Sequence, residues 1–229
     1  MKLGVIADIH GDYAALVSAL DRLENFHQVD QILCAGDLVG RGPEQEKVVE
    51  IIRQRRIASV KGNHDEWAFE GFSHENADFL EELPINWQER MEGYNVFMCH
   101  GKPGNNIWGL YRDHVSNTLL NMMLKSLNAD VLIVGHTHVP MYIRVASGIV
   151  INPGSLYTFD SIRETSHTYG VLNLPDLNFE LFDLMADPIL GLFVTTEHDG
   201  NGQQQPGGQC SFHGAFHVQK NASGGLSDF

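Results

Sequence analysis

The segment from Leu3 to Gly11 reads Leu-Gly-Val-Ile-Ala-Asp-Ile-His-Gly, an apolar run that ends in an acidic residue, a histidine and a glycine. A short apolar run bounded by turn residues is typical of a buried strand. Tyr13 to Phe26 then places apolar side chains at helical spacing, and Gln31 to Ala35 is a second apolar run, which ends in Gly36-Asp37. This order predicts two parallel strands joined by a helix.

The same pattern occurs once more. We expect Pro43 to open a helix, because proline is favoured in a first helical turn. The apolar residues of that helix are Val48, Val49, Ile51 and Ile52. Ile57 to Val60 is a third expected strand, and it ends in Gly62-Asn63-His64-Asp65. The first quarter of the chain therefore predicts a parallel or mixed sheet with helices on its faces.

Beyond this region the helices and strands alternate less regularly. We expect two short helices within Trp67 to Met91, a strand over Tyr94 to Cys99, a loop over Lys102 to Asp113 and a helix over Val115 to Leu127, with Leu119, Leu120, Met123 and Leu127 facing inward. Val131 to Val134 is a further expected strand. Four consecutive antiparallel strands are expected to follow: Met141 to Val145, Gly148 to Asn152, Tyr169 to Leu174 and Phe179 to Leu184. The result would be two sheets covered by helices.

Five turns share one feature: each follows an expected strand and combines glycine with aspartate, asparagine or histidine. They are Asp8-Ile9-His10-Gly11, Gly36-Asp37, Gly62-Asn63-His64-Asp65, His100-Gly101 and Gly135-His136-Thr137-His138. The carboxyl ends of strands collect ligand-binding residues in α/β sheets, so these side chains are expected to converge. Carboxylate, amide and imidazole groups are ligands for divalent transition metals. In an extended segment, Asp-x-His and His-x-His each put two such ligands on one side.

Each of these signals is weak alone. An Asp-Gly pair is usually a turn, His-x-His by itself is uninformative, and Asn63-His64 after a glycine could be only a helix cap. All five turns in order, each at the end of an expected strand, are hard to obtain by chance. The sequence therefore predicts a metal site.

The order Asp-x-His, Gly-Asp, Gly-Asn-His-Asp, His-Gly, Gly-His-x-His resembles that of the calcineurin-like metallophosphoesterase superfamily, and most of all its small bacterial and archaeal phosphodiesterase branch. The segments Gly36 to Pro43 and Asn152-Pro153-Gly154-Ser155 strengthen the resemblance, which covers residues 1 to about 184. The resemblance implies an α/β fold, a four-layer α/β/β/α sandwich with two mixed β-sheets.

The resemblance also implies roles for particular residues. Asp8, His10 and His138 would hold a first metal ion, Asn63, His100 and His136 a second, and Asp37 would bridge both. His64 is not a ligand in this assignment; it would approach the leaving group as a general acid. The cofactors implied are two divalent ions, for which Mn, Fe, Ni, Co and Zn all suit these ligands and Mn is favoured by the resemblance.

One departure from a related pattern is informative. Asp37 to Gly42 is similar to the Gly-Asp-x-x-Asp-Arg-Gly motif of the phosphoprotein phosphatase branch, in which the arginine grips phosphate. Arg41 matches that arginine, so it is a candidate substrate-binding residue. Gly40 stands where that branch has the aspartate that supports the catalytic histidine. This departure argues against a Ser/Thr protein phosphatase and leaves the metal site untouched.

The function expected is hydrolysis of phosphodiester or phosphomonoester bonds, with a metal-bridging hydroxide as the nucleophile. The alternatives are a dinucleoside polyphosphate hydrolase, a protein phosphatase and a catalytically silent scaffold of the same fold. The loop after His100 bears on the substrate, because it mixes cationic, amide and aromatic side chains. Those residues are Lys102, Asn105, Asn106, Trp108, Tyr111 and Arg112. A surface loop with one anchoring tryptophan is the simpler interpretation of the same residues.

The composition limits the kinds of partner that the protein is expected to bind. The net charge of −14 is unfavourable for tight nucleic-acid binding, so a small phosphorylated substrate is expected instead. The sequence contains no apolar run long enough for a membrane span. The three cysteines, Cys34, Cys99 and Cys210, lie far apart and fit no disulfide framework or zinc ribbon. These features together predict a cytoplasmic protein.

Residues 186–229 differ in character from the rest. They are rich in glycine and glutamine and have little apolar periodicity, so we expect a metallophosphoesterase domain over residues 1–185 and a flexible or peripherally docked tail over 186–229. The tail histidines His198, His213 and His217 are loosely spaced and are interpreted as solvated. Two apolar patches, Ile189 to Val194 and Phe212 to Val218, could dock on the domain edge or pair with another subunit in a homo-oligomer.

Overall fold

The structure, a computed structural model, describes residues 1–66, 71–157 and 167–186. Its helices are α1 (Tyr13–Asp21), α2 (Gln45–Gln54), α3 (His74–Glu82) and α4 (Asn117–Leu127). Its strands are β1 (Lys2–Ile6), β2 (Gln31–Cys34), β3 (Ala58–Ser59), β4 (Asn86–Met91), β5 (Tyr94–Cys99), β6 (Val131–Ile133), β7 (Met141–Val145), β8 (Gly148–Asn152), β9 (Thr168–Asn173) and β10 (Asn178–Asp183). The predictions about the tail fall outside the described residues.

The strands form two mixed sheets of five strands each, as predicted. The first has the order β10-β9-β1-β2-β3, with β1, β2 and β3 parallel and β9 antiparallel to β1 and to β10. The second has the order β4-β5-β6-β8-β7, with β5, β6 and β8 parallel and β4 and β7 antiparallel at its edges. Mixed sheets of this kind need helices or a second sheet over the faces of their parallel strands.

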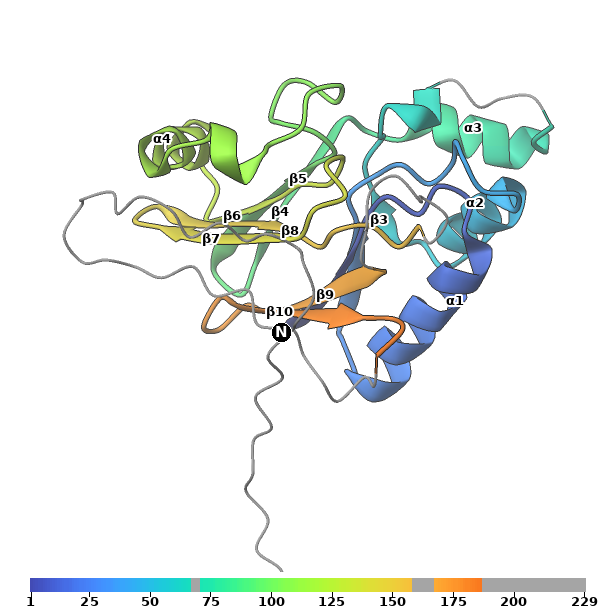
Figure 1. The fold of residues 1–229 in the computed structure, drawn as a ribbon, viewed down its shortest axis with the longest axis horizontal. Coiled ribbons are helices and arrows are strands. Elements are labelled where there is room, and N and C mark those ends of the chain that lie inside the picture. Colours follow the sequence, from blue (N-terminus) through green and yellow to red (C-terminus); the bar gives the residue numbers. More distant parts are fainter. Residues whose placement is uncertain (67–70, 158–166, 187–229) are drawn as a thin grey trace, which may run out of the picture. The chain divides into compact units, whose positions relative to one another are not determined.

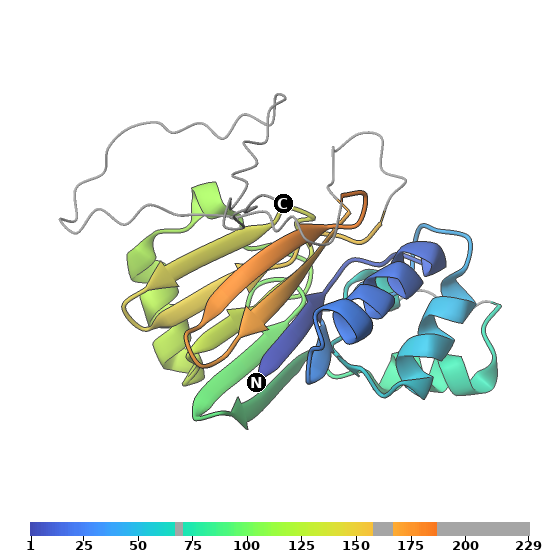
Figure 2. The ribbon, with the colours of Figure 1, turned by 90° about the horizontal axis from the view of Figure 1, so that it is seen from below.

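The sheets and helices stack in four layers because successive residues of a strand face opposite sides. In β1, Leu3 and Val5 belong to the core between the two sheets, whereas Ile6 packs in a second core with Leu16 and Leu20 of α1. A third core holds Leu120, Leu124, Leu132 and Val150 under α4. Figure 1 shows α1 and α2 outside one sheet and α4 outside the other, and Figure 2 shows the same layers after a turn of 90°.

Three expectations about local structure need correction. Helix α2 begins at Gln45, so Pro43 lies two residues before the helix instead of in its first turn. Asn86–Met91 is a strand and not the second of two helices, because it pairs along its whole length with β5. Leu119 is exposed, because the face of α4 that packs inward is the one that carries Leu120 and Leu124.

The last four strands were expected to follow one another in a single antiparallel run. β7 pairs antiparallel with β8, and β9 pairs antiparallel with β10, as expected. However, β8 also pairs in parallel with β6, while β9 joins the other sheet beside β1. The chain therefore changes sheets between β8 and β9.

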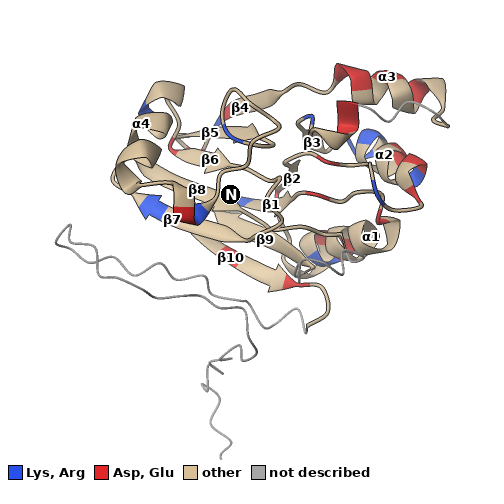
Figure 3. Ribbon diagram, turned by 45° about the horizontal axis from the view of Figure 1, so that its top comes forward, with Lys and Arg blue, Asp and Glu red and all other residues tan. Residues whose placement is uncertain are grey.

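Charged residues occur on the helices, strands and loops of the described part of the chain. In the ribbon of Figure 3 the colour for acidic residues is concentrated on α3, whose acidic residues Glu75, Asp78, Glu81 and Glu82 are exposed. Much of the negative charge in this part of the chain is therefore solvated. Cys34 and Cys99 are buried free thiols, as expected. Within the described ranges, no helix is both long enough and apolar enough to cross a membrane.

Candidate active site

The candidate ligands lie in the turns that follow β1, β2, β3, β5 and β6, at the carboxyl ends of the parallel strands. The backbone in these turns is not extended, contrary to our expectation for Asp-x-His and His-x-His. Asp8, His10, His136 and His138 have positive φ values of 52°, 49°, 67° and 57°, which belong to the left-handed region. His136 and His138 consequently turn in different directions and enter different clusters, whereas Asp8 and His10 belong to the same cluster.

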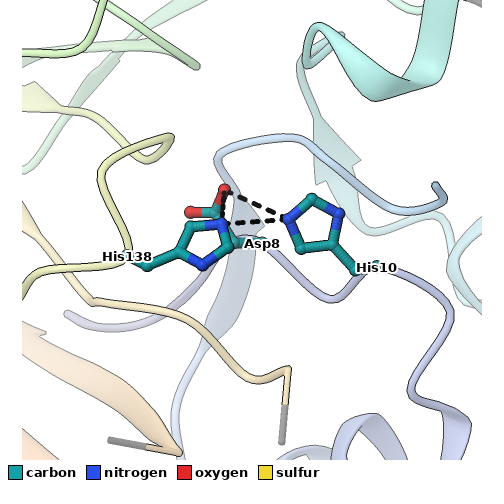
Figure 4. Close-up of side chains that lie close together, drawn as sticks. All are labelled: Asp8, His10 and His138. Atoms are coloured by element: carbon teal, nitrogen blue, oxygen red, sulfur yellow. Dashed lines mark hydrogen bonds and ion pairs between the residues drawn. The ribbon is translucent and has the colours of Figure 1, made fainter. Parts of the chain in front are cut away.

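The first cluster joins the turn after β1 to the turn after β6. The Nε2 atoms of His10 and His138 are 3.0 Å apart, and Asp8 Oδ1 lies 3.3 Å from His138 Nε2 and 3.9 Å from His10 Nε2. Figure 4 shows these three side chains pointing at one another, Asp8 and His10 from the turn after β1 and His138 from the turn after β6. Asp8 and His10 are fully buried, and His138 is 5% exposed. The group has the composition and spacing of a metal site.

The second cluster lies beside the first and shares one carboxylate with it. His100 Nε2 lies 3.1 Å from Asn63 Oδ1 and 3.3 Å from His136 Nδ1, and His136 Nδ1 is 2.8 Å from Asn63 Oδ1. Asp37 Oδ2 is 3.3 Å from His100 Nε2 and 3.6 Å from His10 Nε2. The structure thus brings all seven candidate ligands together, with Asp37 between the two groups.

The donor chemistry of the clusters fits divalent cations. The Nδ1–H groups of His10 and His100 donate to the carbonyls of Val39 and Ala35, because a carbonyl can only accept. Their Nε2 atoms are then left with lone pairs that face other acceptors. Asp8 Oδ1 is buried without a hydrogen-bond partner. Lone pairs that converge in a buried space repel one another unless a cation lies between them.

Protons take the place of a cation when no metal is bound. Burial lowers the pKa of His10 to about 4, despite the nearby carboxylates of Asp37 and Asp8. Burial also lowers the pKa of His100, but the carboxylate of Asp37 outweighs it and raises this pKa to about 9. Burial alone would raise the pKa of Asp37, yet His100 and His10 hold it below its ordinary value. Metal binding at this centre must therefore displace a proton from His100.

Sequence reasoning quoted Asp65 within the Gly-Asn-His-Asp turn but gave it no role. Its buried carboxylate accepts backbone N–H groups from Asp37 at 3.0 Å, Leu38 at 2.8 Å, Val39 at 3.2 Å and Gly62 at 2.8 Å. Burial and then the charge of Asp37 raise the pKa of Asp65 to about 7, although these N–H groups oppose that rise. The hydrogen bonds of Asp65 connect the turn after β2 with the turn after β3 and thereby hold Asp37 beside Asn63.

A second set of supporting hydrogen bonds comes from Asn152, the last residue of β8, and from Ser155, which follows the strand. Sequence analysis named this segment only as part of a resemblance. Asn152 Nδ2 donates to the carbonyl of Gly135 at 2.8 Å and to the hydroxyl of Thr137 at 3.1 Å, which holds the turn that carries both histidines. Ser155 Oγ donates to the carbonyl of Asp8 at 2.8 Å. The segment therefore supports the first cluster from behind.

His64 lies next to the clusters. Its backbone N–H donates to Asp37 Oδ1 at 2.9 Å, and its ring packs edge-on against His10 with the ring centroids 4.9 Å apart. A half-buried imidazole in this place can reach a substrate bound at the ligands. Arg41 is exposed on the loop that also carries Asp37. Both residues are thus on segments that supply ligands.

The loop after His100 forms a wall of the site. Asn106 Nδ2 donates to Glu66 Oε1 at 2.6 Å, which ties the loop to the short turn that contains His64. At Gly109, a Cβ atom would lie 2.8 Å from His136 Cδ2 and 3.1 Å from Tyr111 Cε2, so the loop is in close contact with a candidate ligand. Trp108 and Tyr111 are 65% and 37% exposed, which makes Trp108 a poor anchor for packing.

Comparison with known sequences gives matches that extend over most of the chain. The family profile described as the calcineurin-like phosphoesterase superfamily domain matches residues 1–176. An uncharacterized protein of Methanocaldococcus jannaschii is 29% identical over 177 residues, which are 68% of this chain and 70% of that protein. Shorter matches are serine/threonine-protein phosphatase 2 of Escherichia coli, 43% identical over 30% of this chain and 31% of the relative, and the symmetrical bis(5'-nucleosyl)-tetraphosphatase of Erwinia tasmaniensis, 40% identical over 28% and 24%.

Solved structures share the fold. A hypothetical protein of Pyrococcus horikoshii superposes with a TM-score of 0.70 at 20% identity, over 80% of this chain and 87% of that one. An archaeal phosphodiesterase superposes with a TM-score of 0.57 at 21% identity, over 80% and 99%. At these identities the structural comparison shows a shared fold, whereas the match to the family profile shows membership of the family. On both grounds, together with the Asp, Asn and His cluster, the chain belongs to the calcineurin-like phosphoesterase superfamily, whose members depend on metals.

Proposed function

We propose that this chain hydrolyses phosphodiester bonds at a centre of two divalent metal ions. The observation that carries the proposal is the pair of clusters that share Asp37, whose Oδ2 atom is 3.6 Å from His10 Nε2 and 3.3 Å from His100 Nε2. One bridging carboxylate with three further ligands on each side is the arrangement that two neighbouring ions need. When bound, such ions supply Lewis acidity and lower the pKa of a coordinated water.

The remaining chemistry falls to the side chains around the ligands. In our proposal, His64 gives a proton to the leaving oxygen from Nε2, because its Nδ1 atom is the one that lies against Gly40. Arg41 binds a non-bridging phosphate oxygen through its guanidinium group. The Asp65 carboxylate, which accepts backbone N–H groups, and the Asn152 amide hold the ligand-bearing turns in place during the reaction.

Metal content tests the dinuclear proposal without any assay of activity. Protein purified without chelator and reloaded with Mn²⁺ should contain about two ions per chain by elemental analysis. Asp37→Asn should lose more than one ion, because Asp37 serves both clusters. The exposed Asp78→Asn on α3 is the matched control and should retain both. A ceiling of one ion that Asp37→Asn leaves unchanged would refute the dinuclear centre.

Turnover of His64→Ala tests the role of the general acid. The variant should keep its metal ions, while its turnover falls by about 10²–10⁴-fold, the usual effect of removing a positioned acid. The loss should be smaller for nitrophenyl esters, whose leaving group needs no proton. Loss of metal from His64→Ala would instead make this residue a ligand. A metal-loaded protein that hydrolyses no ester in a broad panel would favour the silent scaffold.

Hydrolysis of dinucleoside polyphosphates is a second candidate function. It is favoured by the exposed aromatic side chains of Trp108 and Tyr111, on which a nucleobase could stack, because Gly109 of the same loop lies against the candidate ligand His136. The Erwinia tasmaniensis relative is named for this activity, although the match spans about a quarter of its length. Diadenosine tetraphosphate and bis(p-nitrophenyl) phosphate should be compared in the native protein and in Trp108→Ala. A rise in KM for the nucleotide alone would select this candidate.

A further inference from the structure

The ring of His64 packs directly on the main chain of Gly40, which lies in the same loop as Asp37 but is not a candidate ligand. A Cβ atom added to Gly40 would lie 2.5 Å from His64 Nδ1 and 2.8 Å from both Cβ and Cγ of His64. Real Cβ atoms essentially never come within 3.0 Å of such neighbours, so one side must move. The atoms in conflict include the base of the imidazole, which has no flexible end that could turn aside.

His64 has little room to give way. Its backbone N–H is fixed on Asp37 Oδ1 at 2.9 Å, and the other side of its ring faces His10 with the centroids 4.9 Å apart. In the described part of the chain, no side chain or carbonyl hydrogen-bonds to its ring, so packing sets the ring's direction. A group wedged in at position 40 would therefore turn the imidazole away from its present place.

Gly40 is also held firmly. Its φ of +120° lies in a region that side chains rarely adopt, and its N–H donates to Gln45 Oε1 at 3.0 Å, at the start of α2. Gly42, two residues further on, would meet the carbonyl oxygen of His10 at 2.7 Å if it carried a Cβ atom. The loop is thus pinned at Gln45 and packed against two histidine-bearing segments.

We propose that Gly40 is a positioning residue for the general acid. Because Gly40 has no side chain, the imidazole of His64 packs directly on its Cα atom, and this contact orients the ring toward the leaving oxygen. The proposal rests on the proposed function of His64. It also explains why this chain lacks the aspartate of the Gly-Asp-x-x-Asp-Arg-Gly pattern, because no carboxylate side chain fits between Gly40 and a ring in this place. Here the main chain supports the histidine where that pattern has a side chain.

Gly40→Ala is the test, and Gly93→Ala is its matched control. Gly93, in the turn between β4 and β5, has a φ of +91° but nothing within 4 Å of an added Cβ, so it reports backbone strain without a collision. Both variants should lose stability in urea. Only Gly40→Ala should shift the ring resonances of His64 in a histidine-labelled NMR spectrum, a measurement that needs no activity.

Kinetics then show whether the displacement matters. With Mn²⁺ loaded, Gly40→Ala should keep its metal content and lower kcat on diphenyl phosphate by at least about tenfold, with a smaller loss on bis(p-nitrophenyl) phosphate. In a His64→Ala background, the same change should cost less than about threefold, because residues that act through one another are not additive. Equal losses on both esters, additive losses, or loss of metal would each overturn the proposal.

If Gly40→Ala does not fold, a second variant tests the same proposal. Gln45→Ala removes the acceptor of the Gly40 N–H and adds no atoms, so it should give a smaller loss with the same preference for the phenyl ester. If the native protein hydrolyses neither ester, the proposed function fails, while the shift of the His64 resonances still decides whether Gly40 positions the ring. An unshifted His64 spectrum in a folded Gly40→Ala variant would refute the packing role by itself.

Discussion

Backbone strain at single residues is concentrated at the candidate metal centre. Five of its seven proposed ligands have positive φ, with values of 52°, 49°, 54°, 67° and 57° at Asp8, His10, Asp37, His136 and His138. Aspartate and histidine tolerate this region better than most residues, yet each such conformation costs about 1–3 kcal/mol. Such strained conformations persist only where the surrounding structure holds them in place. Here the hydrogen bonds of Asp65, Asn152 and Ser155 hold the strained turns.

Asp65→Asn should therefore weaken both the fold and the centre. One amide oxygen cannot accept the four backbone N–H groups that the carboxylate accepts, and the amide nitrogen would face some of them as a second donor. We expect a loss of about 2–4 kcal/mol in the free energy of unfolding, as for other buried charge-assisted hydrogen bonds. Urea denaturation of the metal-free protein measures it.

The exposed Asp78→Asn on α3 provides the comparison, because it makes the same chemical change in water. It should alter the free energy of unfolding by less than about 0.5 kcal/mol. Mn²⁺ affinity should fall in Asp65→Asn as well, since Asp37 and Asn63 are no longer fixed beside each other. Native affinity and native stability in that variant would show that the turns hold their shape without the carboxylate.

The end of the first helix provides an element whose packing depends on pH. α1 continues into a π-helical turn, Arg22–Phe26, and His27 follows it. The ring of His27 packs against Phe182 with centroids 4.2 Å apart and hydrogen-bonds to the hydroxyl of Tyr169 at 3.0 Å. Burial, then the charges of Lys2 and Arg22, lower the pKa of His27 from 6.5 to about 4. These contacts join the helix layer to β9 and β10, and the lowered pKa means that the folded state favours the neutral imidazole.

His27→Phe should change how stability depends on pH. Because the pKa of His27 is lower in the folded state, the native protein gains full stability from the neutral ring above pH 6.5 and loses it as the pH falls towards 4. The variant lacks this dependence, so its stability relative to the native protein should rise between pH 6.5 and 4. Urea denaturation across that range measures the difference.

The exposed His74 at the start of α3 serves as the control histidine, because folding leaves it in contact with water. The stability of His74→Phe relative to the native protein should stay level over the same pH range. A level difference for His27→Phe would mean that the ring titrates alike in the folded and unfolded chains. The packing at the end of α1 would then be independent of its charge.

At the scale of the whole molecule, metal binding should couple to folding. The ligands come from turns as distant in sequence as His10 and His138, so the unfolded chain cannot assemble the centre. An ion that binds only the folded state stabilises it by about 2.7 kcal/mol at a concentration of 100 times Kd. The midpoint of urea denaturation should therefore rise on addition of Mn²⁺ and fall with chelator. In Asp37→Asn, the difference between the urea midpoints with Mn²⁺ and with chelator should be smaller. Identical denaturation curves of the native protein with and without metal would contradict the coupling.

The proposed domain boundary leads to a separate prediction for the whole chain. The family match ends at residue 176, and the last strand of the described residues ends at Asp183. Truncation after Asp187 should keep turnover within a few fold, and sedimentation should show whether the oligomeric state changes. A fall in turnover of more than about two orders of magnitude with metal retained, which is roughly 2.7 kcal/mol of transition-state stabilisation, would place part of the tail in the active site.

The sequence by itself determined the strands, the turns at their ends and the residue types that those turns carry. Apolar runs such as Leu3 to Ala7 encode a strand locally, and an Asp, Asn or His beside glycine marks the turn that follows. The residue types alone predicted a metal site, and a resemblance supplied the ligand set. The strands and turns could be predicted because they depend on neighbours in sequence, where propensity and side-chain chemistry act directly. The assignment of the seven ligands stays a prediction.

Only the tertiary structure decided how distant segments meet. Asn86–Met91 became an edge strand because it pairs with β5, which outweighs its polar, helix-compatible composition. The His-x-His pair was divided between two clusters by the left-handed backbone at His136 and His138. Asp65 and Gly40 had no recognisable role until the turns that they touch were in place. Contacts of this kind join residues far apart in the chain, and hydrogen bonds and close packing across that separation have no local pattern in the sequence.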